Sequence, residues 1–121
     1  VRHDSFCTPE FPALLRKHNI ANVYADHATY PEIADVTADF VYARLQTGSD
    51  DVETAYDAAM LDQWAGRLKT WANGGEPEDL PKVDPAYLPL ATPRDVFAFI
   101  IHEGKVRAPH GAVALQGLVD K

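Results

Sequence analysis

The sequence of 121 residues has one cysteine, no long apolar run and a shortage of positive charge. The single cysteine, Cys7, excludes an internal disulfide bond and favours a reducing, intracellular compartment. No apolar stretch approaches the length of about 20 residues that a membrane-spanning helix needs, so we expect no membrane segment and a cytoplasmic protein. Lysine and arginine number 11 against 18 aspartate and glutamate residues, and the net charge of -7 argues against general binding to nucleic-acid backbones.

Compact catalytic and cofactor motifs are also missing. The sequence has no Walker loop, no GxGxxG, no paired cysteines and no GxSxG, so nucleoside-triphosphate, dinucleotide and serine-hydrolase chemistry have no direct support and no cofactor is indicated. A metal site would need His3, Asp26 and His102 to meet at one point, and since no short-spacing signature supports it, none is predicted. Cys7 has no identifiable partner base, which favours a buried or half-buried structural thiol over a nucleophile.

What the sequence does contain is an alternation of strands and helices, which is typical of an α/β protein. Phe40–Leu45 is an almost unbroken apolar run and indicates a strand buried on both faces of a parallel sheet. Two further strands are predicted over residues 20–25 and 96–101. Helices are predicted from the N-cap Thr8 to a left-handed Asn19, from the N-cap Asp57 to Asn73, and from Pro109 to near the last residue.

Two segments lack a regular apolar period and are predicted to be loops. Residues 28–35 contain a proline and lead directly into the strand that begins at Phe40. Residues 74–93 contain five of the nine prolines, which indicates an extended Pro-rich loop along the surface.

Four motifs connect the chain with a known family. VRHDSF at the start, NVYADH, TADFVYARL and the later APHGAVAL occur in this order and resemble the C-terminal half of the YecE-like family, known as domain of unknown function 72. The resemblance implies a TIM-type β/α barrel of about twice this length. Residues 1–121 are then expected to form a single α/β unit, the second half of a barrel with parallel strands inside and helices outside, in which residues 1–3 end a strand.

The candidate site is formed by the polar residues where the strands end. Ligands bind at the carboxyl ends of parallel strands, so residues that are far apart in sequence are expected to converge there. His3 and Asp26 would form an acid-base pair, because a carboxylate orients an imidazole. An alternative for Arg44 is a structural ion pair with Asp26. The expected ligand-binding residues are Arg2, His27, Arg44, Gln46, His102 and Glu103.

Two functions from different classes remain open. Guanidinium groups and other hydrogen-bond donors gathered at the strand ends suit a small anionic or phosphorylated ligand or a phosphodiester. Such a site could also carry out hydrolase-type acid-base chemistry. The alternative is a non-enzymatic binding or scaffold module that recruits a protein partner through the Pro-rich loop. The sequence does not decide whether the protein is an enzyme.

A half barrel would also need something to cover its sheet. The inward faces of the three predicted strands would have no opposing wall, and exposed strand edges invite pairing with another chain. We therefore expect either a homodimer or association with the missing N-terminal half.

Overall fold

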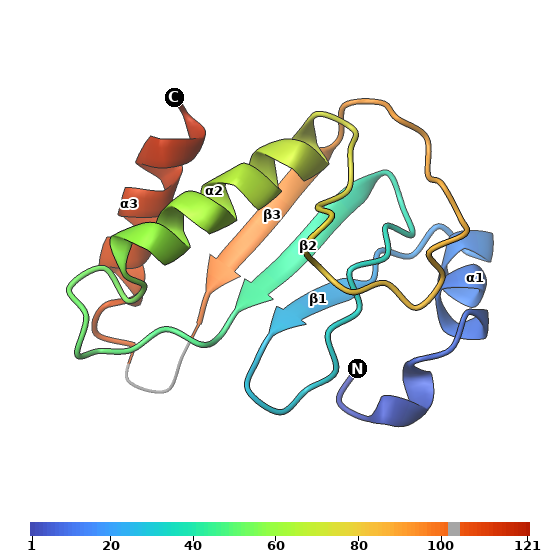
Figure 1. Cartoon of the computed structure of the whole chain (residues 1–121), viewed down its shortest axis with the longest axis horizontal. Helices are drawn as coiled ribbons and strands as arrows, with labels where there is room; N and C mark the ends of the chain where they lie inside the picture. Colours follow the sequence, from blue (N-terminus) through green and yellow to red (C-terminus); the bar gives the residue numbers. More distant parts are fainter. Residues whose placement is uncertain (102–104) are drawn as a thin grey trace.

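The computed structural model describes residues 1–101 and 105–121. Three parallel strands form one sheet, and two long helices pack along one of its faces (Figure 1). In chain order the elements are the 3-10 helix η1 (Asp4–Phe6), α1 (Glu10–Lys17), β1 (Val23–Asp26), β2 (Phe40–Leu45), α2 (Ala58–Ala72), β3 (Asp95–Ile100) and α3 (Ala108–Val119). This confirms the α/β class and the parallel sheet.

The strands lie in the order in which they occur along the chain, β1-β2-β3. Ala25 is the register partner of Arg44, and Arg44 is the partner of Phe99. The bounds of β2 match the prediction, whereas β1 begins at Val23 rather than at residue 20. Ile20 lies before β1 and is 51% exposed, because the chain has not yet entered the sheet at that point.

Helix α2 provides the core. Asp57 caps it by accepting a hydrogen bond from the Met60 amide at 2.8 Å, as predicted. Trp64 and Trp71 are each 1% exposed and contact the ring of Tyr24 on β1, with centroid distances of 5.8 and 5.9 Å. Burial of such large rings supplies much of the hydrophobic stabilisation of a small domain.

The two faces of the sheet are different, which corrects the prediction that the strands are buried on both. Along β2, burial alternates between buried and half-buried residues, and β3 alternates between exposed and half-buried ones. We call the side away from α2 the open face, because no helix among the described residues covers it. It carries Val23, Ala25, Phe40, Tyr42, Arg44, Phe97 and Phe99.

The N-terminal segment differs from its predicted form. Residues 1–3 are not a strand, and His3 instead caps η1, with Nδ1 accepting from the Ser5 amide. Cys7 is exposed rather than buried, because it follows η1 at the surface. Asn19 ends the α1 segment in the left-handed conformation with φ 51°, as predicted.

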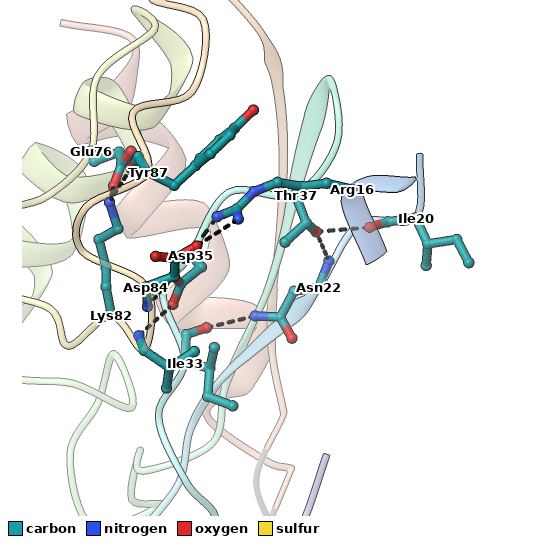
Figure 2. A network of polar contacts seen from close by, with 11 residues as sticks. Arg16, Ile20, Asn22, Ile33, Asp35, Thr37, Glu76, Lys82, Asp84 and Tyr87 are labelled. Atoms are coloured by element: carbon teal, nitrogen blue, oxygen red, sulfur yellow. Dashed lines mark hydrogen bonds and ion pairs between the residues drawn. The ribbon is translucent and has the colours of Figure 1, made fainter. Parts of the chain in front are cut away.

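The Pro-rich loop is attached to the body of the protein by buried charges (Figure 2). The Asp35 carboxylate accepts hydrogen bonds from the amides of Val83 and Asp84 at 2.8 and 2.9 Å. Arg16 of α1 binds Asp84 at 3.1 Å, and its guanidinium lies 3.6 Å from the centre of the Tyr87 ring. These contacts lie beside the turn that precedes β1, away from the carboxyl ends of the strands.

None of the helices in the described ranges is long and apolar enough to cross a membrane.

Candidate functional site

The candidate site lies at the edge of the sheet where the parallel strands end. The Gln46 amide donates to the Asp26 carbonyl at 2.8 Å, and the Ile101 amide donates to the Leu45 carbonyl at 2.9 Å. These bonds extend the strand pairing and hold the three strand ends at one level. Asp26, His27, Arg44 and Gln46 thus lie along one edge of the sheet, whereas His102 and Glu103 lie outside the described residues.

Asp26 belongs to a hydrogen-bonded group that links β1 to the loop after β2. Its Oδ2 accepts from the Thr47 hydroxyl at 2.6 Å and from the Tyr56 hydroxyl at 2.9 Å. Tyr56 in turn accepts from the Thr47 amide at 3.1 Å and is 4% exposed. Burial, together with the negative charge of Asp26, raises the pKa of the Tyr56 phenol well above its usual range. Tyr56 is therefore a firm hydrogen-bond donor to Asp26.

Sequence reasoning missed Thr47 and Tyr56. Thr47 follows Gln46 directly, where the apolar pattern of the strand has already ended. Tyr56 lies in an irregular segment whose apolar neighbours suggest packing rather than function. Only the folded loop brings its hydroxyl to Asp26.

His27 is held in one orientation by its own loop. Its Nδ1 accepts from the amides of Thr29 and Tyr30 at 3.1 and 3.3 Å, so in the neutral ring this nitrogen carries the lone pair and Nε2 carries the hydrogen. The ring stacks on Tyr30 with a centroid distance of 3.6 Å, and the Arg2 guanidinium lies 5.0 Å from the Tyr30 centroid. His27 is therefore oriented as a donor, with Arg2 close to the same stack.

Arg44 lies on the open face, between Ala25 of β1 and Phe99 of β3. Gln46 and His27 directly follow β2 and β1, at the same end of the sheet as Arg44. Asp26 belongs to the opposite face, and it bonds Tyr56 and Thr47 there. Arg44 and Asp26 form no ion pair with each other, which corrects the structural alternative for Arg44. Within the described part of the chain, no ion pair occupies the Arg44 guanidinium.

His3 is not brought into contact with Asp26. Its Nδ1 lies 2.9 Å from the Ser5 hydroxyl and accepts from the Ser5 amide, and the residue is exposed. The Asp26 contacts are with Thr47 and Tyr56 instead. The reason is that residues 1–3 are not in the sheet, so His3 has no strand to place it at the edge.

A helix N-terminus close to this edge is already occupied by a carboxylate. Asp50, in the loop after β2, accepts from the amides of Val106 and Arg107 at 3.1 and 3.0 Å, where α3 begins. Helix N-termini bind anions readily, and here the anion is a side chain of the protein itself. The start of α3 is therefore not open to an external anion.

Among the described residues, metal ligands do not gather at this edge. No group of three or more histidine, cysteine, aspartate or glutamate residues that could hold a metal ion occurs within residues 1–101 and 105–121. His102, one of the three ligands that a metal site would need, falls between these ranges.

The fold and the site together define a parallel α/β protein with hydrogen-bond donors at the carboxyl ends of its strands. The chain belongs to the family described as "Protein of unknown function DUF72", whose family model matches residues 1–121. This confirms the resemblance seen in the four sequence motifs. No curated protein and no solved structure matches the chain.

Proposed function

We propose that the protein binds a small anionic ligand, such as a phosphorylated compound or a phosphodiester, at the carboxyl edge of the open face. The observation that carries this proposal is Arg44, a cation on the open face without an ion-pair partner among the described residues. A guanidinium group presents planar, paired donors that match phosphate and carboxylate oxygens. The Nε2 hydrogen of His27 and the side-chain amide of Gln46 add neutral donors at the same strand ends.

We further propose that residues 1–121 form the second half of a β/α barrel. The parallel strands in sequential order and the helices on one face support this, because both are features of such barrels. The open face then corresponds to the barrel interior, and Arg44 points into it. Arg2 would join the anion site through the Tyr30 stack, and His102 and Glu103 would follow the last strand.

The proposal extends to acid-base chemistry of the hydrolase type at this edge. Asp26 supplies the carboxylate, and its Oδ2 accepts from the hydroxyls of Thr47 and Tyr56, whereas Oδ1 has no partner within the described residues. Because Asp26 lies on the face opposite Arg44, a ligand held by Arg44 would have to extend past the strand ends to reach this oxygen. A general base must reach the proton that it removes. A pairing of His3 with Asp26 would require residues 1–3 to move to the sheet.

The binding proposal is tested by thermal shift with a library of phosphate esters and nucleotides. A bound ligand at about 100 times its dissociation constant stabilises a protein by about 2.7 kcal/mol, which is a shift of several degrees in a chain of this size. We expect such a shift with the unmodified protein and its loss in Arg44→Ala. Arg67→Ala is the matched control, because Arg67 of α2 pairs with Asp79 of the Pro-rich loop, and its removal should leave the shift unchanged. A library without any shift, or shifts that survive in Arg44→Ala, would refute the proposal.

A scaffold function without catalysis is the second candidate, and the end of the Pro-rich loop favours it. Leu88 and Leu90 are 82% and 81% exposed, although the earlier part of the loop is bound to Arg16 and Asp35. Exposed leucines on a well-anchored loop are suited to contact a protein partner. The double variant Leu88→Ser/Leu90→Ser should then lose partner capture without any loss of ligand-induced shift. Equal capture by the variant and the unmodified chain would exclude this function.

A further inference from the structure

Three residues of the open face lie at one level, close to the carboxyl ends of the strands. Ala25, Arg44 and Phe99 are register partners across β1, β2 and β3, and each is followed by the last residue of its strand. We call these three residues the upper layer. Neighbouring strands are about 4.8 Å apart, so the side chain of Phe99 stands directly beside that of Arg44. Arg44 is therefore flanked by an aromatic side chain on one side and by a methyl group on the other.

Tyr42 adds a second ring beside Arg44. It precedes Arg44 by two residues and therefore lies on the same face of β2. Its register partner is Phe97, yet its ring stacks on Phe99, with a centroid distance of 5.1 Å and an angle of 30° between the ring planes. This contact runs diagonally toward the carboxyl ends of the strands. An aromatic pair, Tyr42 and Phe99, thus borders the arginine on the β3 side.

The other aromatic contact of this face lies closer to the amino ends of the strands. Phe97 meets Phe40 edge to face, with a centroid distance of 6.0 Å and an angle of 84°. In β/α barrels, ligands bind at the carboxyl ends of the strands, whereas the side chains deeper inside pack as a core. The position of Phe40 and Phe97 therefore suits packing, and the position of Tyr42 and Phe99 suits contact with a ligand.

We propose that the anionic ligand carries a planar aromatic ring, which stacks on Tyr42 and Phe99 while Arg44 binds the anionic group. This inference rests on the proposed function, because Arg44 has to hold the anion. A phosphate ester of an aromatic alcohol has the required composition, with oxygens that match the guanidinium group and a ring that matches the aromatic pair. The substrate class is then narrower than phosphorylated compounds in general.

The upper layer also sets the direction of the ring. Ala25 has only a methyl group, so β1 presents no ring at this level. The aromatic part of the ligand is therefore directed toward β3, and the phosphate remains at the guanidinium group of Arg44. Stacking on aromatic side chains adds affinity that depends little on which ring is bound. The pair consequently selects for the presence of a ring rather than for its substituents.

The test is a titration of the purified protein with phenyl phosphate and methyl phosphate, followed by two-dimensional NMR, which measures weak dissociation constants. The two esters carry the same anionic group. We expect phenyl phosphate to bind about five- to 150-fold more tightly, which is the range that stacking of one ring contributes. Arg44→Ala should abolish the binding of both esters, because it removes the group that holds the phosphate.

Two leucine variants of β3 locate the ring. Phe99→Leu should reduce the preference for phenyl phosphate to less than about threefold and leave the affinity for methyl phosphate unchanged, because leucine is apolar but has no aromatic face. Phe97→Leu is the matched control, since it makes the same change on the same face, and the two phenylalanines are similarly exposed, at 48% and 43%. It should retain the preference. Tyr42→Leu replaces Phe99→Leu if that variant fails to fold.

The outcomes separate this inference from the proposed function. A preference that is lost in Phe99→Leu and retained in Phe97→Leu supports the inference. Equal binding of the two esters to the unmodified protein overturns it and leaves the anion site intact. A preference that survives in Phe99→Leu, or that is lost equally in both leucine variants, also overturns it. If neither ester binds, or if both still bind to Arg44→Ala, the proposed function fails and the inference fails with it.

Discussion

Replacing Asp35 by alanine is expected to lower the free energy of unfolding by about 3–5 kcal/mol, the cost of breaking a buried charge pair from one side. The Asp35 side chain is fully buried and accepts the amides of Val83 and Asp84. Its Oδ2 also lies 3.9 Å from Nη2 of Arg16. In the alanine variant, the amides of Val83 and Asp84 would lose their acceptor. The buried Arg16 guanidinium would keep only one carboxylate partner, Asp84.

Arg16 makes this loss especially large. Its Nε and Nη2 atoms are buried and have no hydrogen-bond partner among the described residues, even in the unmodified protein. Unpaired buried donors cost about 1–3 kcal/mol each, so the charge of Asp35 is an important compensation for them. A domain of this size has a total stability of about 5–15 kcal/mol, and the variant would therefore unfold a substantial fraction of the protein under mild conditions.

Urea unfolding followed by tryptophan fluorescence measures the effect, because Trp64 and Trp71 are buried in the core. Asp79→Ala is the control. Asp79 binds Arg67 at 3.0 Å but is 48% exposed, and exposed ion pairs contribute at most about 1 kcal/mol. If Asp35→Ala were no more destabilising than Asp79→Ala, the Pro-rich loop would not depend on the buried charge.

The second large effect is expected for Arg94, at the start of β3. Its Nη1 donates to the carbonyls of Trp71 and Gly75 at 2.9 and 2.7 Å, and its Nη2 donates to those of Gly74 and Leu90, both at 3.1 Å. Burial lowers the pKa of the guanidinium, which nevertheless remains charged at neutral pH. One side chain thus binds the carbonyls that end α2 and connects them to the Pro-rich loop.

Arg94→Ala should reduce the stability by about 2–4 kcal/mol, since hydrogen bonds to charged groups contribute about 1.5–3 kcal/mol each and the partly exposed carbonyls recover water. Hydrogen exchange should accelerate at the amides of Gly74 and Gly75, which close the end of α2. Arg94→Lys keeps the charge but loses the planar fork, so it should restore only a minor part of the stability.

Arg67→Ala is the matched control for Arg94, because it removes an α2 arginine whose partner in the Pro-rich loop, Asp79, is 48% exposed. Its effect should remain within about 1 kcal/mol. Equal losses for the two alanine variants would show that the four carbonyl contacts of Arg94 add nothing to stability.

The predictable part of the site was its position along the chain. Asp26, His27, Arg44 and Gln46 could be placed at strand ends because an apolar run stops and a polar residue follows. Their division between the two faces could not be predicted with the same certainty, since it depends on which face the helices cover. Tyr56 was missed because its contact with Asp26 spans 30 residues and requires the loop to fold back.

The sequence by itself determined the class of fold, the limits of β2, the cap of α2 at Asp57 and the family, because these depend on local propensity and on motifs. Only the tertiary structure decided that Arg44 lies on an uncovered face, that Asp26 turns toward Tyr56, and that Asp35 and Arg94 anchor the Pro-rich loop. The physical reason is that burial and charge pairing arise from residues distant in sequence. A pattern of apolar residues specifies that a strand forms, but the packing of other elements against that strand determines which of its faces remains exposed.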